Sequence, residues 1–201
     1  MEYDRTTVET DAGPFSIVEH YDDGSMGNPL DEYDHDGMAL FVYTREYRGW
    51  RPVYQDLSDS PAEQALLSLI NDHGGYGDNQ DVVRRMSKWL AIAGNPATFV
   101  QGSVGTRSSE VYYFALVDDT YGHPAGAVES VMREYASWET GEVYGYVVEG
   151  PDGDEVDSCW GFIGNESREE MISEARASVE YDVRERVKAS NRVGAGFVGI
   201  V

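Results

Sequence analysis

The order of apolar and polar residues predicts short strands mixed with amphipathic helices. Two continuous apolar runs, residues 38–44 (MALFVYT) and 111–117 (VYYFALV), have the length and the β-branched and aromatic content of buried strands. Residues 2–9, 15–19 and 97–101 are shorter strand candidates. Apolar residues at helical spacing predict four helices, over residues 60–73, 79–93, 126–138 and 167–189.

Start signals mark the first and the last of these helices. Ser60 is a suitable N-cap, Pro61 stands at the first helical position, and Glu63 follows three residues after Ser60. Ser167 and Glu170 form a second capping-box pattern. We therefore expect one helix to begin next to Ser60 and another to begin at Ser167.

The best-specified pattern in the chain is that of a β-hairpin, EVYGYVVEGPDGDEVDSCWGFIG. Its first arm, residues 143–149, is rich in Val and Tyr, and its turn, residues 150–154, contains Pro and Gly. The second arm, residues 155–163, alternates between two faces. Strict alternation predicts that Trp160 is a core anchor packed against the following helix, and that Asp157 points the other way.

Helices and strands follow one another without regular βαβ alternation, which favours the α+β class. We expect a mixed, mainly antiparallel sheet with about four helices, ending in the hairpin and a long C-terminal helix. Residues 1–201 are expected to form a single domain, with the helical middle, residues 60–95, as a candidate sub-domain. The apolar, Gly-rich stretch 193–201 is a candidate final strand.

Charge is the main compositional signal. The chain contains 37 acidic and 15 basic residues, a formal net charge of −22. Residues 1–60 contain 14 acidic and four basic residues. Residues 61–105 contain four acidic and three basic residues, and residues 106–190 contain 19 acidic and seven basic residues. Such a protein repels nucleic acid and anionic membranes and is attracted to basic surfaces. Simple solvation or adaptation to high salt is the alternative, and the ratio of 13 Arg to two Lys fits a GC-rich or a halophilic source equally well.

Other classes find little support in the sequence. No run of 18 apolar residues is present, and the acidic N-terminal stretch lacks the apolar region of a signal peptide. The single cysteine, Cys159, excludes an internal disulfide framework. We expect a cytoplasmic protein without a cofactor.

One loop has the composition of a metal site. Asp31, Asp34 and Asp36 are closely spaced oxygen ligands, and His35 lies among them. The spacing does not match an EF-hand, and the chain has no HExxH, GxSxG or Walker motif. A metal-dependent hydrolase that uses these four residues is the enzymatic alternative, and a solvated acidic loop is the simpler interpretation.

The hairpin resembles a segment of an uncharacterised family of small bacteriophage and mobile-element proteins. The matching stretches are residues 141–149 (GEVYGYVVE) and 156–164 (VDSCWGFIG). Residues 28–45 are similar to an upstream block of that family, although Tyr33 stands where the family has Trp. The resemblance covers about a third of the chain. It implies a phage or mobile-element accessory protein and transfers no catalytic residue.

Together these observations predict a non-enzymatic, acidic phage accessory protein in the host cytoplasm. Its expected partner is a basic, DNA-binding host protein of the defence against phages. The accessory protein is expected to inhibit that partner by mimicking DNA. It is not expected to bind nucleic acid or membranes directly. A halophilic globular domain of unrelated function is a further alternative. The expected binding residues are carboxylates in the acidic loop and in the hairpin: Asp31, Asp34, Asp36, Asp152, Asp154, Glu155 and Asp157.

Overall fold

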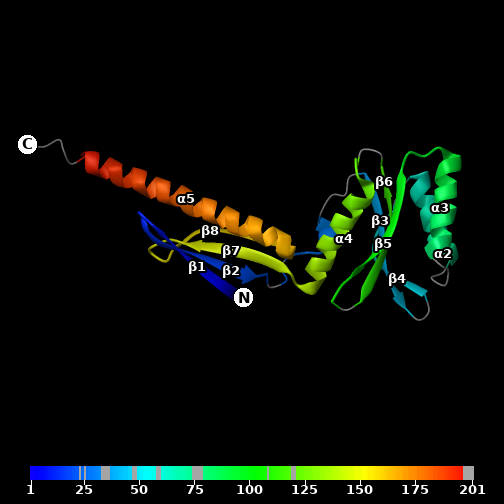
Figure 1. Ribbon diagram of the computed structural model, residues 1–201, viewed down its shortest axis with the longest axis horizontal. Helices are drawn as coiled ribbons and strands as arrows, with labels where there is room; N and C mark the ends of the chain where they lie inside the picture. Colours follow the sequence, from blue (N-terminus) through cyan, green and yellow to red (C-terminus); the bar gives the residue numbers. More distant parts are fainter. Residues whose placement is uncertain are drawn as a thin grey trace, which may run out of the picture. The chain divides into compact units, whose positions relative to one another are not determined.

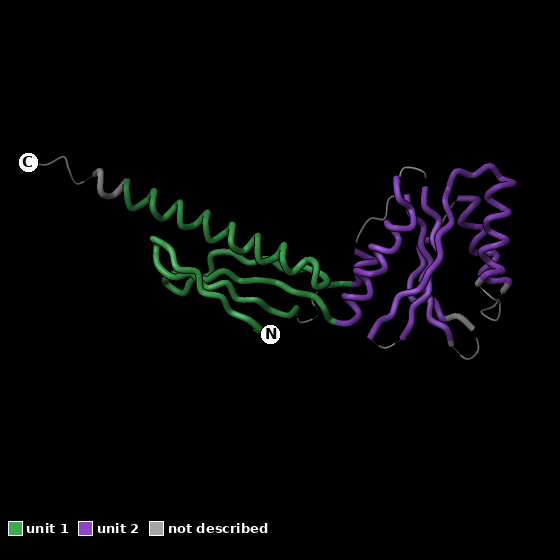
Figure 2. The backbone as a smooth tube through the Cα atoms, in the orientation of Figure 1, with its two compact units in different colours: residues 1–27, 141–201 green, residues 28–140 purple. Residues whose placement is uncertain are grey.

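The computed structural model describes residues 1–22, 24, 26–32, 37–46, 49–57, 60–73, 79–107, 109–118 and 121–196. Contacts divide the chain into two compact units, unit 1 with residues 1–27 and 141–201, and unit 2 with residues 28–140 (Figure 2). The described part holds five helices and two antiparallel sheets of four strands each, which confirms the α+β prediction. The expectation of a single domain stays a prediction.

Unit 1 is an antiparallel sheet with one long helix, α5, across one face (Figure 1). The strands lie in the order β1 (Glu2–Thr10), β2 (Gly13–Tyr21), β7 (Val143–Glu149) and β8 (Glu155–Ile163). Helix α5 spans Gly164–Gly196. Its apolar stripe packs on the strands to form one core, made of Phe15, Ile17, Tyr144, Tyr146, Val148, Met171, Ala175 and Val179.

Unit 2 is a sheet covered by helices on both faces. The strand order is β4 (Gly49–Asp56), β3 (Met38–Glu46), β6 (Glu110–Val117) and β5 (Thr98–Gly105). Helices α1 (Pro29–Glu32) and α4 (Pro124–Thr140) contribute to the core on one face, and α2 (Pro61–His73) and α3 (Asn79–Ala93) to the core on the other.

Two covered faces explain the two apolar runs of the sequence. In β3, the four consecutive residues from Leu40 to Tyr43 are all buried, with even-numbered side chains in one core and odd-numbered ones in the other. Because β3 is buried on both faces, its sequence lacks the alternation of polar and apolar residues.

The predicted N-cap of α2 is also present, since the Glu63 N–H donates to Ser60 Oγ at 3.2 Å.

Several boundaries differ from the predictions. Helix α5 begins at Gly164, so Ser167 lies inside its first turn and donates to the Ile163 carbonyl instead of capping the helix. The same helix continues to Gly196, so the prediction of a strand over residues 193–201 is wrong for residues 193–196, and residues 197–201 lie outside the described residues. Strand β4 is absent from the predicted strands, because it is ordered by pairing with β3 and its own sequence is largely polar.

A β-bulge overturns the predicted faces of β8. Trp160 is paired with Gly145 and Phe162 with Tyr144, so Gly161 between them has no partner in β7. Gly161 has a φ of +94°, a conformation that glycine adopts without steric cost. The extra residue shifts the alternation by one, and Phe162 faces α5 while Trp160 faces away from it.

Candidate functional site

Two acidic turns meet at one end of the unit 1 sheet. The β1–β2 turn contains Asp11, and the β7–β8 turn contains Asp152 and Asp154. A Cβ added to Gly13 would lie 2.9 Å from Pro151 Cβ, so the two turns are in contact. We call the exposed carboxylates at this end the acidic turn pair: Glu9, Asp11, Asp152, Asp154 and Glu155.

Three of the predicted binding residues thus lie in the acidic turn pair. Asp154 is exposed, and the exposed Glu155 accepts a hydrogen bond from Ser158 Oγ at 2.8 Å. The Asp152 carboxylate forms an ion pair with Arg186 Nη1 of α5 at 3.0 Å, and Nε of the same guanidinium pairs with the Asp182 carboxylate at 2.5 Å. One cation therefore ties the turn to the helix and offsets only part of the negative charge.

Asp157 has a different environment from its neighbours in the hairpin. Its half-buried carboxylate accepts hydrogen bonds from the Tyr146 hydroxyl at 3.1 Å and from Ser178 Oγ of α5. Burial raises the pKa of Tyr146, and the Asp157 carboxylate raises it further. The prediction that Asp157 points away from the helix is wrong, because the register with β7 shifts on both sides of residues 157–160, at Val156 and at Gly161, which reverses the faces of the residues between them.

Trp160 is on the open face of the sheet. It is 47% exposed, its indole covers Gly145, and its centroid lies 5.5 Å from that of the His20 ring. The prediction of a core anchor is therefore wrong. Gly145 permits this arrangement because it has no side chain to displace the indole.

The acidic loop of the metal hypothesis lies mostly outside the described residues. Asp31 is exposed in α1 of unit 2, and Asp34, His35 and Asp36 are not among the described residues. Within the part of the chain that is described, no three His, Cys, Asp or Glu side chains gather closely enough to hold a metal ion. The hydrolase interpretation stays a prediction, which metal titration by calorimetry can test.

A groove runs between the edge strand β1 and helix α5. Its volume is about 610 Å³. The strand side is lined by small, mostly β-branched residues, Thr6, Thr7, Val8 and Thr10. The helix side combines an apolar strip with charged residues, Arg176, Val179, Glu180, Val183 and Arg184. Helical spacing in the sequence predicts the apolar strip, but only the strand order shows that β1 is an edge.

A buried carboxylate marks the opposite end of β1. Glu19 is 3% exposed, and it accepts hydrogen bonds from the Tyr3 hydroxyl at 2.6 Å and from Arg168 Nε at 2.9 Å. Burial, together with the Glu19 carboxylate, raises the pKa of Tyr3. The bond to Glu19 raises the pKa of Arg168. Because Tyr3 lies in β1 and Arg168 lies in α5, their hydrogen bonds to Glu19 of β2 hold both elements against the sheet.

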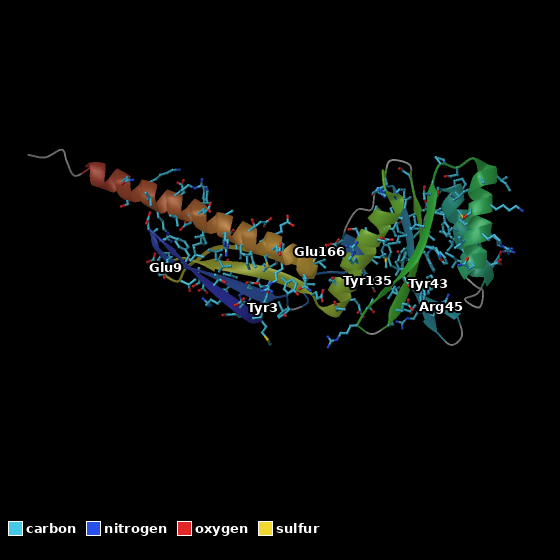
Figure 3. All side chains as sticks on the ribbon, in the orientation of Figure 1. Tyr3, Glu9, Tyr43, Arg45, Tyr135 and Glu166 are labelled. Carbon is cyan, nitrogen blue, oxygen red and sulfur yellow. The ribbon has the colours of Figure 1, made fainter. Side chains whose placement is uncertain are left out.

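Figure 3 labels one residue near each end of β1: Tyr3, which belongs to the buried network, and Glu9, which belongs to the acidic turn pair. The groove and the acidic turn pair therefore share the Glu9 end of one strand. This arrangement can recognise another chain through backbone groups, apolar contacts and charge.

Comparison with protein-family models, with curated proteins and with solved structures finds no match to this chain. Among the helices of the described residues, none is both long enough and apolar enough to cross a lipid bilayer.

Proposed function

We propose that this protein is a non-enzymatic binding protein whose acidic surface recognises a basic surface of another protein. The observation that carries the proposal is the acidic turn pair, in which two turns far apart in the sequence are in contact and both carry exposed carboxylates. Residues 1–27 and 141–201 together contain 20 acidic and seven basic residues, so unit 1 has a formal net charge of −13.

Electrostatics gives this surface a defined effect. Exposed carboxylates at the rim of an interface accelerate association with a cationic partner and disfavour anionic ones. Salt weakens the attraction, because the Debye length falls from about 30 Å at 0.01 M salt to about 8 Å at 0.15 M. The sheet and the Arg186–Asp152 pair hold the backbone of the turns, so the positions that carry the carboxylates are fixed before a partner arrives.

The most specific form of the proposal is an accessory protein of a bacteriophage that acts in the cytoplasm of the infected cell. There it mimics DNA toward a host nuclease, restriction enzyme or other defence protein. The net charge of −22 supports this form, as does the resemblance of the hairpin to segments of phage and mobile-element proteins. DNA-binding enzymes have basic surfaces that carboxylates can occupy in place of phosphates.

A matched pair of triple variants tests the proposal. Asp152→Asn, Asp154→Asn and Glu155→Gln together remove three charges from the acidic turn pair. Glu169→Gln, Glu170→Gln and Glu174→Gln remove three charges from the exposed surface of α5, as the control. The parent and both variants are immobilised, and basic proteins captured from a bacterial lysate are quantified by mass spectrometry.

We expect the parent and the control to retain the same basic, DNA-binding protein at about 50 mM salt and to lose it at about 500 mM. The turn variant should retain at least about tenfold less, since three rim charges affect the association rate together. Equal retention by both triple variants, or capture of no basic protein by the parent, would contradict the proposal.

A further inference from the structure

The free edge of β1 presents backbone groups in a known order. Among the described residues, β1 pairs with β2 alone and ends the sheet order β1-β2-β7-β8. At the end of β2, the Tyr21 N–H donates to the Met1 carbonyl, and the N–H of the next residue, Asp22, donates to the Val143 carbonyl. Odd-numbered residues of β2 therefore bond toward β1, and even-numbered residues bond toward β7.

The register carries this alternation into β1. The register shifts between Glu2 and Asp4, and from Asp4 onward it is regular, with Ile17 opposite Thr6. In this part of β1 the even-numbered residues form the ladder with β2. The N–H and C=O groups of Thr7 and Glu9 consequently point away from the sheet. Arg5 follows the same rule, because its N–H does not join the ladder and donates instead to the Asp4 carboxylate at 2.8 Å.

The groove lies directly beside this edge. A strand added to β1 would run about 4.8 Å from it, and every second side chain of that strand would face α5. Those side chains would meet Val8 on the strand side and Val179 and Val183 on the helix side. The edge thus offers backbone hydrogen bonds, and the groove offers space for alternate side chains.

We propose that β1 and α5 bind an extended segment of a basic partner protein by strand addition. This inference rests on the proposed function, and it identifies β1 and α5 as the elements that bind the partner. Main-chain hydrogen bonds to Thr7 and Glu9 supply affinity, and the groove selects the side chains that face α5. The acidic turn pair lies at the Glu9 end of the groove and attracts the basic residues of the segment.

Charge predicts where those basic residues stand. Arg176 and Arg184 line the helix side of the groove, so positions of the segment that face α5 should be small, apolar or β-branched. Positions on the other face lie opposite Glu9 and Thr7, where Lys or Arg meets a carboxylate without facing the arginines of α5. The ligand is therefore a strand in which Val, Ile or Thr alternates with Lys or Arg.

A random peptide library provides the probe. Peptides about nine residues long, the length of β1, are selected on the full chain, and the selected sequences are made synthetically. We expect apolar or β-branched residues to alternate with basic ones. Binding of a labelled selected peptide is then measured by fluorescence anisotropy to the parent and to three variants.

The variants separate the edge from the fold. Thr7→Pro removes an N–H that faces the free edge, and proline is tolerated on edge strands. Thr6→Trp fills the groove from an exposed position without changing a backbone group. Thr7→Ala keeps the N–H and is the control. We expect the first two to weaken binding at least about tenfold and Thr7→Ala to change it less than about threefold. Circular dichroism verifies that each variant is folded.

Three results would overturn the proposal. The library could select no peptide, or Thr7→Pro and Thr6→Trp could bind the selected peptide as the parent does. The chain could also form a concentration-dependent dimer that Thr7→Pro dissociates, which would assign the edge to a second copy. If the turn variant loses the basic protein partner while Thr7→Pro and Thr6→Trp retain it, strand addition fails and the proposed function stands.

Discussion

The two units of the chain use a four-stranded antiparallel sheet in different ways. In unit 2 the sheet has a core on each face, one built with α1 and α4 and the other with α2 and α3. In unit 1 a single helix covers one face, and Trp160 lies half-exposed on the other. The same number of strands thus gives a closed unit and an open one.

This difference separates stability from recognition. Side chains between layers are fully removed from water, and each contributes to the free energy of folding. Backbone groups at a free edge and half-exposed side chains contribute less to folding and remain available for a partner. We therefore expect substitutions in the closed sheet to reduce stability most, and substitutions on the open sheet to leave the fold largely intact.

The largest effect is expected for Phe114→Ala in the unit 2 sheet. Phe114 is 0% exposed, and its ring stacks with Tyr43 at 5.5 Å and with Phe99 at 5.8 Å between centroids. Truncating a buried Phe costs about 3–5 kcal/mol, against a total stability of about 5–15 kcal/mol for a domain. Urea unfolding measures the loss, and Phe114→Leu, which nearly conserves volume, should cost no more than about 1.5 kcal/mol. A loss below about 1 kcal/mol for Phe114→Ala would show that this core is loosely packed.

A small effect is expected for Trp160→Ala in the unit 1 sheet. The side chain already exposes 47% of its surface, so truncation returns only part of an indole to water. We expect a loss of about 1 kcal/mol, well below that of a buried Trp. Thermal unfolding of the variant, followed by circular dichroism, measures it. A loss as large as that of Phe114→Ala would place Trp160 in the core after all.

Local patterns in the sequence predict the local structure well. Unbroken apolar runs identify β3 and β6 because both of their faces are buried, and Ser60 with Pro61 marks the start of α2. Val179 and Val183 follow from helical spacing in α5. These signals depend only on neighbours within one element, so they can be read without knowing the fold.

Features that depend on distant partners are not predictable in this way. The register shifts at Val156 and Gly161 reverse the faces of Asp157 and Trp160, and both shifts follow from the pairing with β7. The contact between Gly13 and Pro151 follows from the pairing of β2 with β7. The sequence identifies acidic residues, but the strand order decides which of them meet and which strand has a free edge.

Amide hydrogen exchange along β1, followed by nuclear magnetic resonance in the free protein, tests the central claim most directly. If β1 is an open edge, the amides of Thr6 and Val8 are protected by the ladder with β2, and those of Thr7 and Glu9 exchange rapidly. The amide of Phe114, inside the closed sheet of unit 2, should exchange slowly. Equal protection of Thr6, Thr7, Val8 and Glu9 would show that the edge is already covered, and would contradict the proposal that β1 binds a partner by strand addition.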